Sequence, residues 1–113
     1  MAHVEILESL YEKIEREFKG RASEVFDLIE SVEKSPHKGK SLGHVGGIAI
    51  KEIRFEGFRF YFLVDEYKLK FADEQGLQEL LLRFVRMSNK KEQQRVIDEI
   101  KHILRTIGFF GFK

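Results

Sequence analysis

Two short turns between alternating apolar runs constrain the fold of this chain more than any other feature. The runs Ile48–Phe55, Phe58–Val64 and Tyr67–Phe71 place apolar or aromatic residues at alternate positions, and only Glu56-Gly57 and Asp65-Glu66 separate them. Alternation with a period of two predicts β-strands, and two-residue connections predict tight hairpins. We therefore expect an antiparallel meander of three strands.

The same turns predict which side chains lie opposite one another, because a two-residue loop fixes the register of a hairpin. Arg54 is then placed opposite Arg59. The other cross-strand pairs expected on this register are Glu52 with Tyr61, Lys70 with Tyr61, and Lys68 with Leu63.

The register also divides the side chains between two faces of the expected sheet. One face is an apolar floor made by Phe55, Phe58, Phe60, Phe62, Val64, Leu69 and Phe71. The opposite face gathers four cations around Tyr61, namely Arg54, Arg59, Lys68 and Lys70. Like charges directly opposite each other destabilise a sheet, so the facing arginines indicate an anion, such as a phosphate, between them. The alternative is that these cations only solvate an exposed sheet face.

Apolar residues at helical spacing predict two helices before the meander and one near the end of the sequence. We expect these helices over Glu8–Phe18, Ala22–Glu33 and about Asn89–Arg105. The first two are joined by a short loop and should form an antiparallel hairpin that covers the apolar floor. His3–Ile6 is a candidate first strand, and Lys34–Gly47 is expected to be a flexible basic loop.

The segment Leu77–Met87, which follows an expected turn at Asp73–Gly76, fits two kinds of structure. Its apolar residues match the spacing of a helix, and they also match a strand buried on both faces. Because the apolar run is short and dense, we favour a strand over about residues 79–87. The fold class that follows is α+β in one domain, residues 1–113. A small antiparallel sheet carries an N-terminal helical hairpin on one face and is followed by a C-terminal helix.

Composition excludes several kinds of function. The 113 residues contain no cysteine, which excludes disulfides and thiolate chemistry, and the four histidines are not spaced as metal ligands. We therefore expect neither a metal nor a cofactor. No apolar run approaches the ~20 residues that span a bilayer, so we expect a cytoplasmic protein that does not bind a membrane.

Charge is distributed unevenly along the chain. Residues 1–33 hold nine acidic and four basic side chains, whereas residues 34–113 hold ten acidic and sixteen basic ones. A second basic cluster is expected where the last strand meets the last helix, formed by Arg83, Arg86, Lys90, Lys91 and Arg95. Basic grooves with an aromatic ring for stacking, here Tyr61, are typical of proteins that bind single-stranded RNA. A solvated strand–helix junction has the same composition.

The segment Phe109–Phe112 carries three phenylalanines within four residues. Three exposed rings would form an adhesive apolar patch. We expect the segment to dock on its own core, on a second copy of the chain in a homodimer, or on a partner protein.

The order of these elements resembles the RelE/ParE/HigB superfamily of bacterial and archaeal toxins. The best-matching stretch is Ile50-Lys51-Glu52-Ile53-Arg54 followed by Gly57-Phe58-Arg59-Phe60-Tyr61-Phe62. It is similar to the family pattern of an Arg-ending strand, a turn, and an aromatic–Arg strand. The start Val4–Ser9 and the stretch Phe84-Val85-Arg86 with Asn89–Glu92 are also similar to family members. The match covers nearly the whole chain, and its motifs are loose.

The resemblance implies an mRNA-cleaving toxin whose partners are an antitoxin protein and the ribosome with its mRNA. RelE- and HigB-like members cut mRNA in the ribosomal A site, using the 2′-OH of the RNA as nucleophile. By this resemblance, Arg59 and Arg86 would stabilise the transition state. Lys51 or Arg54 would orient phosphates, and Lys90 or Lys91 would supply a proton relay. The remaining candidate substrate-binding residues are Tyr61, Lys68, Lys70 and Arg83.

Two other activities remain open on the same resemblance. ParE-like members inhibit DNA gyrase and cleave nothing, and a degenerate relative would bind RNA or protein without cleaving. The chain also lacks a tyrosine in its last helix, where several ribonuclease members carry one near the C-terminus. Fold alone does not decide between these functions.

Overall fold

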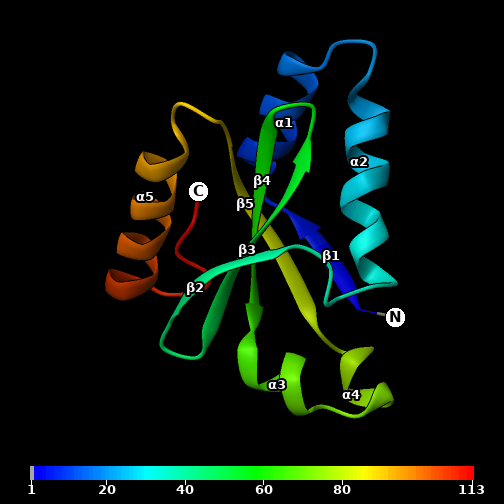
Figure 1. The fold of residues 1–113 in the computed structure, drawn as a ribbon, viewed down its shortest axis with the longest axis vertical. Helices are drawn as coiled ribbons and strands as arrows, with labels where there is room; N and C mark the ends of the chain where they lie inside the picture. Colours follow the sequence, from blue (N-terminus) through cyan, green and yellow to red (C-terminus); the bar gives the residue numbers. More distant parts are fainter. Residues whose placement is uncertain (1) are drawn as a thin grey trace.

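The computed structural model describes residues 2–113, which form an α+β fold with one five-stranded mixed sheet (Figure 1). The spatial order of the strands is β1-β5-β4-β3-β2. β1 pairs in parallel with β5, and the other neighbours are antiparallel. The strands are β1 (His3–Ile6), β2 (Lys40–Val45), β3 (Ile48–Phe55), β4 (Phe58–Asp65) and β5 (Leu81–Asn89).

The hairpin between β3 and β4 has the register expected from the sequence. Its two turn residues adopt positive φ angles, 49° at Glu56 and 87° at Gly57. Positive φ at both central residues is typical of the turn that matches the right-handed twist of paired strands. Arg54 pairs with Arg59, and Glu52 pairs with Tyr61, so the first two cross-strand predictions are confirmed.

The prediction of a third meander strand over Tyr67–Phe71 is wrong. These residues belong to a short helix, α3 (Glu66–Phe71), because the Asp65 side chain accepts a hydrogen bond from the Lys68 backbone N–H at 2.9 Å. A side-chain acceptor at this position starts a helix and ends the strand before it. The strand that pairs with the other edge of β4 is β5, so the expected pairs of Lys68 and Lys70 do not form.

The expected basic loop Lys34–Gly47 contains a strand, β2, that sequence alternation did not reveal. β2 pairs with β3, and the register between them shifts between Ser41 and Gly43. Gly39 precedes this strand at φ 100°, and a Cβ there would lie 2.9 Å from the Glu52 carbonyl oxygen. The glycine therefore lets the chain pass close to β3 before pairing with it.

A helical hairpin covers one face of the sheet, as predicted (Figure 1). It consists of α1 (Glu8–Glu17) and α2 (Ala22–Glu30), which continues as one 3₁₀ turn, η1 (Ser31–Glu33). The apolar faces of these helices form one cluster with the floor of the sheet, including Phe60, Phe62 and Phe84, which are fully buried. Phe71 was expected in this floor but is 70% exposed, because it lies on α3.

The opposite face of the sheet is covered by α5 (Gln93–Thr106), shown to one side of the sheet in Figure 1. Ile100 and Leu104 of this helix pack against Tyr61 and Leu63 of β4. A two-sided core of this kind explains why β4 is buried along most of its length. The apolar spacing in the sequence predicts α5 itself but not the face of the sheet that it covers.

The expected segment around residues 79–87 is a strand, β5, and not a helix. Before it lies a short helix, α4 (Glu74–Leu77), where a turn was expected; Asp73 begins it by accepting a hydrogen bond from the Gly76 N–H at 2.8 Å.

Among residues 2–113, none of the helices combines the length and the apolar character that crossing a bilayer requires.

Phe112 docks on its own fold. It is buried in the cluster beneath α5, and Phe109 packs partly against the same cluster. Phe110 remains exposed. Docking on the core therefore explains the burial of Phe112 and the packing of Phe109, but not the position of Phe110. A homodimer through this segment stays a prediction.

Candidate functional site

Polar side chains gather on the α5 side of the sheet, near the β3–β4 turn. Two adjacent cross-strand rows position them. The first row pairs Glu52 with Tyr61 and Tyr61 with Arg86, and the second pairs Arg54 with Arg59 and Arg59 with Ser88. Residues directly opposite one another project from the same face of a sheet. We call Glu52, Arg54, Arg59, Tyr61 and Ser88 the hairpin-end cluster.

The two facing arginines of this cluster differ in exposure. Arg59 is only 5% exposed, whereas the Arg54 side chain is about half exposed. The Arg59 Nη1 donates a hydrogen bond to the Gly57 carbonyl oxygen at 2.9 Å, and its buried Nε has no hydrogen-bond partner. A buried guanidinium beside a second arginine is electrostatically costly, and an anion between the two would offset that cost.

Glu52 supplies the carboxylate of the cluster and is buried. One oxygen, Oε1, accepts a hydrogen bond from the Arg54 Nη2 at 3.3 Å. The other oxygen, Oε2, is buried with no hydrogen-bond partner. Buried polar atoms without partners are rare in folded proteins, and a catalytic role is one explanation for them. The cluster therefore contains a buried acceptor, the Glu52 Oε2, and a buried donor, the Arg59 Nε, that have no hydrogen-bond partner.

Tyr61 lies at the centre of the cluster but cannot act as predicted. Its ring is fully buried, so it is not available to stack against an RNA base, and that part of the sequence interpretation is wrong. The hydroxyl lies 2.7 Å from the Ser88 hydroxyl, and either group can donate. Burial raises the pKa of the Tyr61 phenol, the Ser88 hydrogen bond opposes that rise, and the nearby Glu52 carboxylate adds to it.

Arg86 occupies the irregular part of β5. The register between β4 and β5 shifts between Tyr61 and Phe62, and Arg86 lies opposite Tyr61 at that shift. Its Nε donates to the Glu99 carboxylate of α5 at 2.6 Å, and its Nη1 donates to the Val85 carbonyl oxygen at 2.8 Å. The guanidinium also lies over the Phe112 ring, 5.4 Å from its centroid. Arg86 is thus next to the cluster, with its charge already paired.

Two other predicted site residues lie elsewhere in the core. Lys51 faces the helical hairpin, where its Nζ donates to the His37 carbonyl oxygen at 2.9 Å and lies 5.8 Å from the Phe62 ring centroid. Burial lowers the pKa of Lys51. Arg83 is buried at the start of β5, 3.4 Å from the Glu5 carboxylate and without hydrogen bonds from its Nε and Nη1. From these positions, neither Lys51 nor Arg83 reaches the hairpin-end cluster.

The four remaining predicted cations are exposed. Lys68 and Lys70 lie on α3, at the opposite end of β4 from the β3–β4 turn (Figure 1), so the structure does not bring them to Arg59. Lys90 and Lys91 lie in the turn between β5 and α5, directly after Ser88 and Asn89. The predicted ring of cations around Tyr61 is therefore reduced to Arg54 and Arg59, with Lys90 and Lys91 following the strand that carries Ser88.

Sequence reasoning missed two members of the cluster, Glu52 and Ser88. The register placed Glu52 opposite Tyr61, which was a sufficient signal, because a carboxylate between two cationic positions points to acid–base chemistry. Nothing in the sequence pattern singles out Ser88. Its pairing with Arg59 depends on β5 joining β4, and no local pattern in the sequence shows that pairing.

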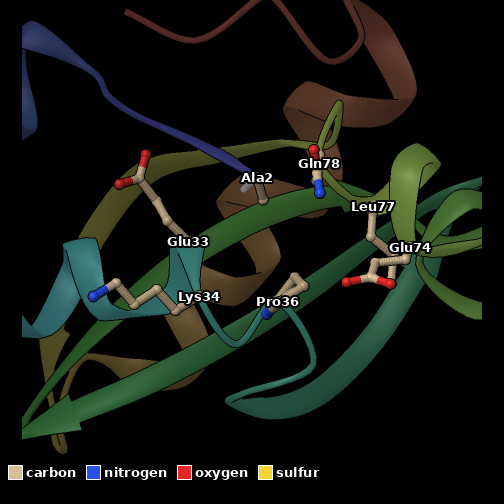
Figure 2. Close-up of a pocket in the computed structure, with 7 residues that line it drawn as sticks. All are labelled: Ala2, Glu33, Lys34, Pro36, Glu74, Leu77 and Gln78. Carbon is tan, nitrogen blue, oxygen red and sulfur yellow. The ribbon is translucent and has the colours of Figure 1, made fainter.

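A separate pocket lies between η1 and α4, and Figure 2 shows the residues that line it. Its two carboxylates come from Glu33 and Glu74. The Glu33 Oε2 accepts a hydrogen bond from the Val4 N–H at 3.0 Å, which fixes the start of β1. This pocket therefore has a structural explanation and contains none of the predicted site residues. Within residues 2–113, no three histidine, aspartate or glutamate side chains gather into a group that would hold a metal ion.

Comparisons with known proteins add no relative. No family model matches the chain, and neither the curated proteins nor the solved structures give a match.

Proposed function

We propose that this protein is a toxin-type endoribonuclease, similar to RelE and HigB, that cleaves mRNA at the hairpin-end cluster. The observation that carries the proposal is the pair of facing arginines, Arg54 and Arg59, beside the buried carboxylate of Glu52. Two cations can bind the charged oxygens of a phosphodiester, and a carboxylate with one unpaired oxygen can accept a proton.

The reaction that fits these groups is attack by the 2′-OH of the RNA on the adjacent phosphorus. The Glu52 carboxylate is buried in this structure, so the side chains that cover it would first have to move aside to admit the RNA. The carboxylate would then take the proton from that hydroxyl as the new O–P bond forms. Arg54 and Arg59 would stabilise the negative charge that develops on the pentavalent phosphorus, because fixed cations are most effective in a site that excludes water. The P–O5′ bond then breaks, and Lys90 or Lys91 would donate the proton to the leaving oxygen.

The order of the elements supports the resemblance to the superfamily. A short strand and a helical hairpin come first, a meander follows, and a basic turn separates the last strand from a terminal helix. The short helices α3 and α4 lie between the meander and the last strand and are not part of the order on which the resemblance rests. An antitoxin that covers the cationic residues and a ribosome that presents the mRNA remain the proposed partners.

The test is inducible expression in bacteria, with growth and mRNA integrity followed together. Expression of the wild type should arrest growth and produce cuts within translated messages that end in a cyclic phosphate. Arg59→Ala should abolish both effects, since loss of one such preorganised donor typically lowers a rate by about 10²–10³. Lys19→Ala, a change to an exposed lysine outside the cluster, is the matched control. Growth arrest with intact mRNA would instead indicate a ParE-like target.

A second candidate function is RNA binding without cleavage, and the pairing of Arg86 favours it. Arg86 is committed to Glu99 at 2.6 Å, so it cannot stabilise a transition state without releasing that carboxylate. Under this alternative, the purified protein would bind single-stranded RNA in a salt-sensitive way and leave it intact. If RNA stays intact after incubation with the protein and translating ribosomes, the protein binds RNA without cleaving it.

A further inference from the structure

A cavity of about 300 Å³ lies beside β5, between that strand and α1. Its polar lining comes from Ser9, Lys13 and Arg16 of α1, together with Arg86 and Lys113. None of the predicted site residues except Arg86 belongs to it. The cavity therefore requires an explanation separate from the hairpin-end cluster.

The path of the chain explains why this cavity exists. β1 pairs with β5 only as far as Phe84, whose carbonyl oxygen accepts a hydrogen bond from the Leu7 N–H at 3.0 Å. The chain then turns away into α1, so the part of β5 that follows Phe84 has no pairing with β1. Ser9, Lys13 and Arg16 are spaced by four and three residues, which places them on one face of α1.

The charge of the cavity is one-sided. Lys13 and Arg16 form no ion pair with any side chain in residues 2–113, although α1 is otherwise acidic. No aspartate or glutamate lines the cavity, and Arg86 has its one carboxylate partner on α5. Arg86 is already paired, but the two unpaired cations, Lys13 and Arg16, make a site for an anion with several oxygens.

We propose that this cavity binds a phosphate of the single-stranded RNA whose reacting phosphate lies at the hairpin-end cluster. The inference rests on the proposed action on RNA. Arg86 connects the two places, because it lines the cavity and lies opposite Tyr61 on β4. The RNA backbone then passes from the β3–β4 turn around the free part of β5 to α1.

The experiment measures binding of a fluorescently labelled single-stranded RNA oligonucleotide by anisotropy over a range of salt concentrations. Lys13→Ala with Arg16→Ala should weaken binding roughly tenfold or more at about 0.1 M salt, because both cations that hold this phosphate are lost. The slope of log affinity against log salt should fall by about 0.7, since each phosphate neutralised on a single strand contributes about 0.7. Lys13→Gln with Arg16→Gln, which keeps longer polar side chains on the helix, should give the same loss.

The control is Lys19→Ala with Lys34→Ala, which removes the same charge from exposed positions outside the cavity. If the double change in the cavity and this control weaken binding equally, while Arg59→Ala weakens it more, the cavity proposal is wrong and the proposed function stands. If the wild type does not bind RNA at all, the proposed function fails and this inference fails with it. Circular dichroism of each variant confirms that the fold is retained.

Discussion

The hydroxyl of Tyr61 lies 2.7 Å from the hydroxyl of Ser88, and this buried hydrogen bond joins β4 to β5 beneath α5. Tyr61→Phe should lower the free energy of unfolding by about 1–3 kcal/mol, because it leaves the buried Ser88 hydroxyl without its partner. Ser88→Ala should have a similar effect. The double variant should lose less than the sum of the two, as measured by urea denaturation in a double-mutant cycle. Additive losses would show that the hydroxyls do not interact.

The raised pKa of Tyr61 predicts a loss of stability at alkaline pH. Burial favours the neutral phenol, so the folded state holds this proton more tightly than the unfolded chain does. The contribution is complete below the unfolded pKa of about 10 and declines as the pH rises from there through the higher folded pKa. Tyr61→Phe should therefore lose less stability than the wild type above about pH 10. Subtracting the ultraviolet titration curve of Tyr61→Phe from that of the wild type isolates this phenol, and its midpoint should lie above that of a free tyrosine.

Phe60 and Arg59 are neighbours in β4 that face opposite sides of the sheet, and their substitution should separate stability from function. Phe60→Ala should cost about 3–5 kcal/mol, because the ring is fully buried in the core beneath the helical hairpin. Arg59→Ala should change the free energy of unfolding by no more than about 1 kcal/mol, since it also removes a buried charge opposite Arg54. Chemical denaturation measures both. Unfolding of Arg59→Ala would show that Arg59 is a structural residue.

Local signals in the sequence were enough to predict the hairpin that carries the site. The Glu56-Gly57 turn fixes the register of β3 and β4, and that register places Arg54 opposite Arg59. The helical hairpin and its packing on the Phe60 face also followed from spacing alone. These features depend on residues that are close in sequence, which is why they could be predicted.

Features that depend on distant pairing could not be predicted in the same way. Tyr67, Leu69 and Phe71 alternate as in a strand, but Asp65 caps a helix there and β4 pairs instead with β5. The apolar stripe of α5 was visible, yet nothing local showed that it would cover the face bearing Tyr61. The burial of that ring, and with it the loss of the expected stacking site, is a consequence of tertiary packing.

Glu52→Gln is the substitution that tests the proposed chemistry most directly. Glutamine has nearly the same shape as glutamate and can still accept a hydrogen bond from Arg54 through its amide oxygen, so the fold should be retained. It cannot accept the proton of the 2′-OH, and cleavage of RNA should therefore fall by about 10²–10⁴, the usual contribution of a positioned base. RNA affinity should stay the same or increase, because a negative charge has been removed beside the phosphate. Anisotropy measures affinity, and gel analysis of a ribosome-bound message measures cleavage. Equal cleavage by Glu52→Gln and the wild type would exclude Glu52 as the base and leave the two arginines to act on an RNA activated by another group.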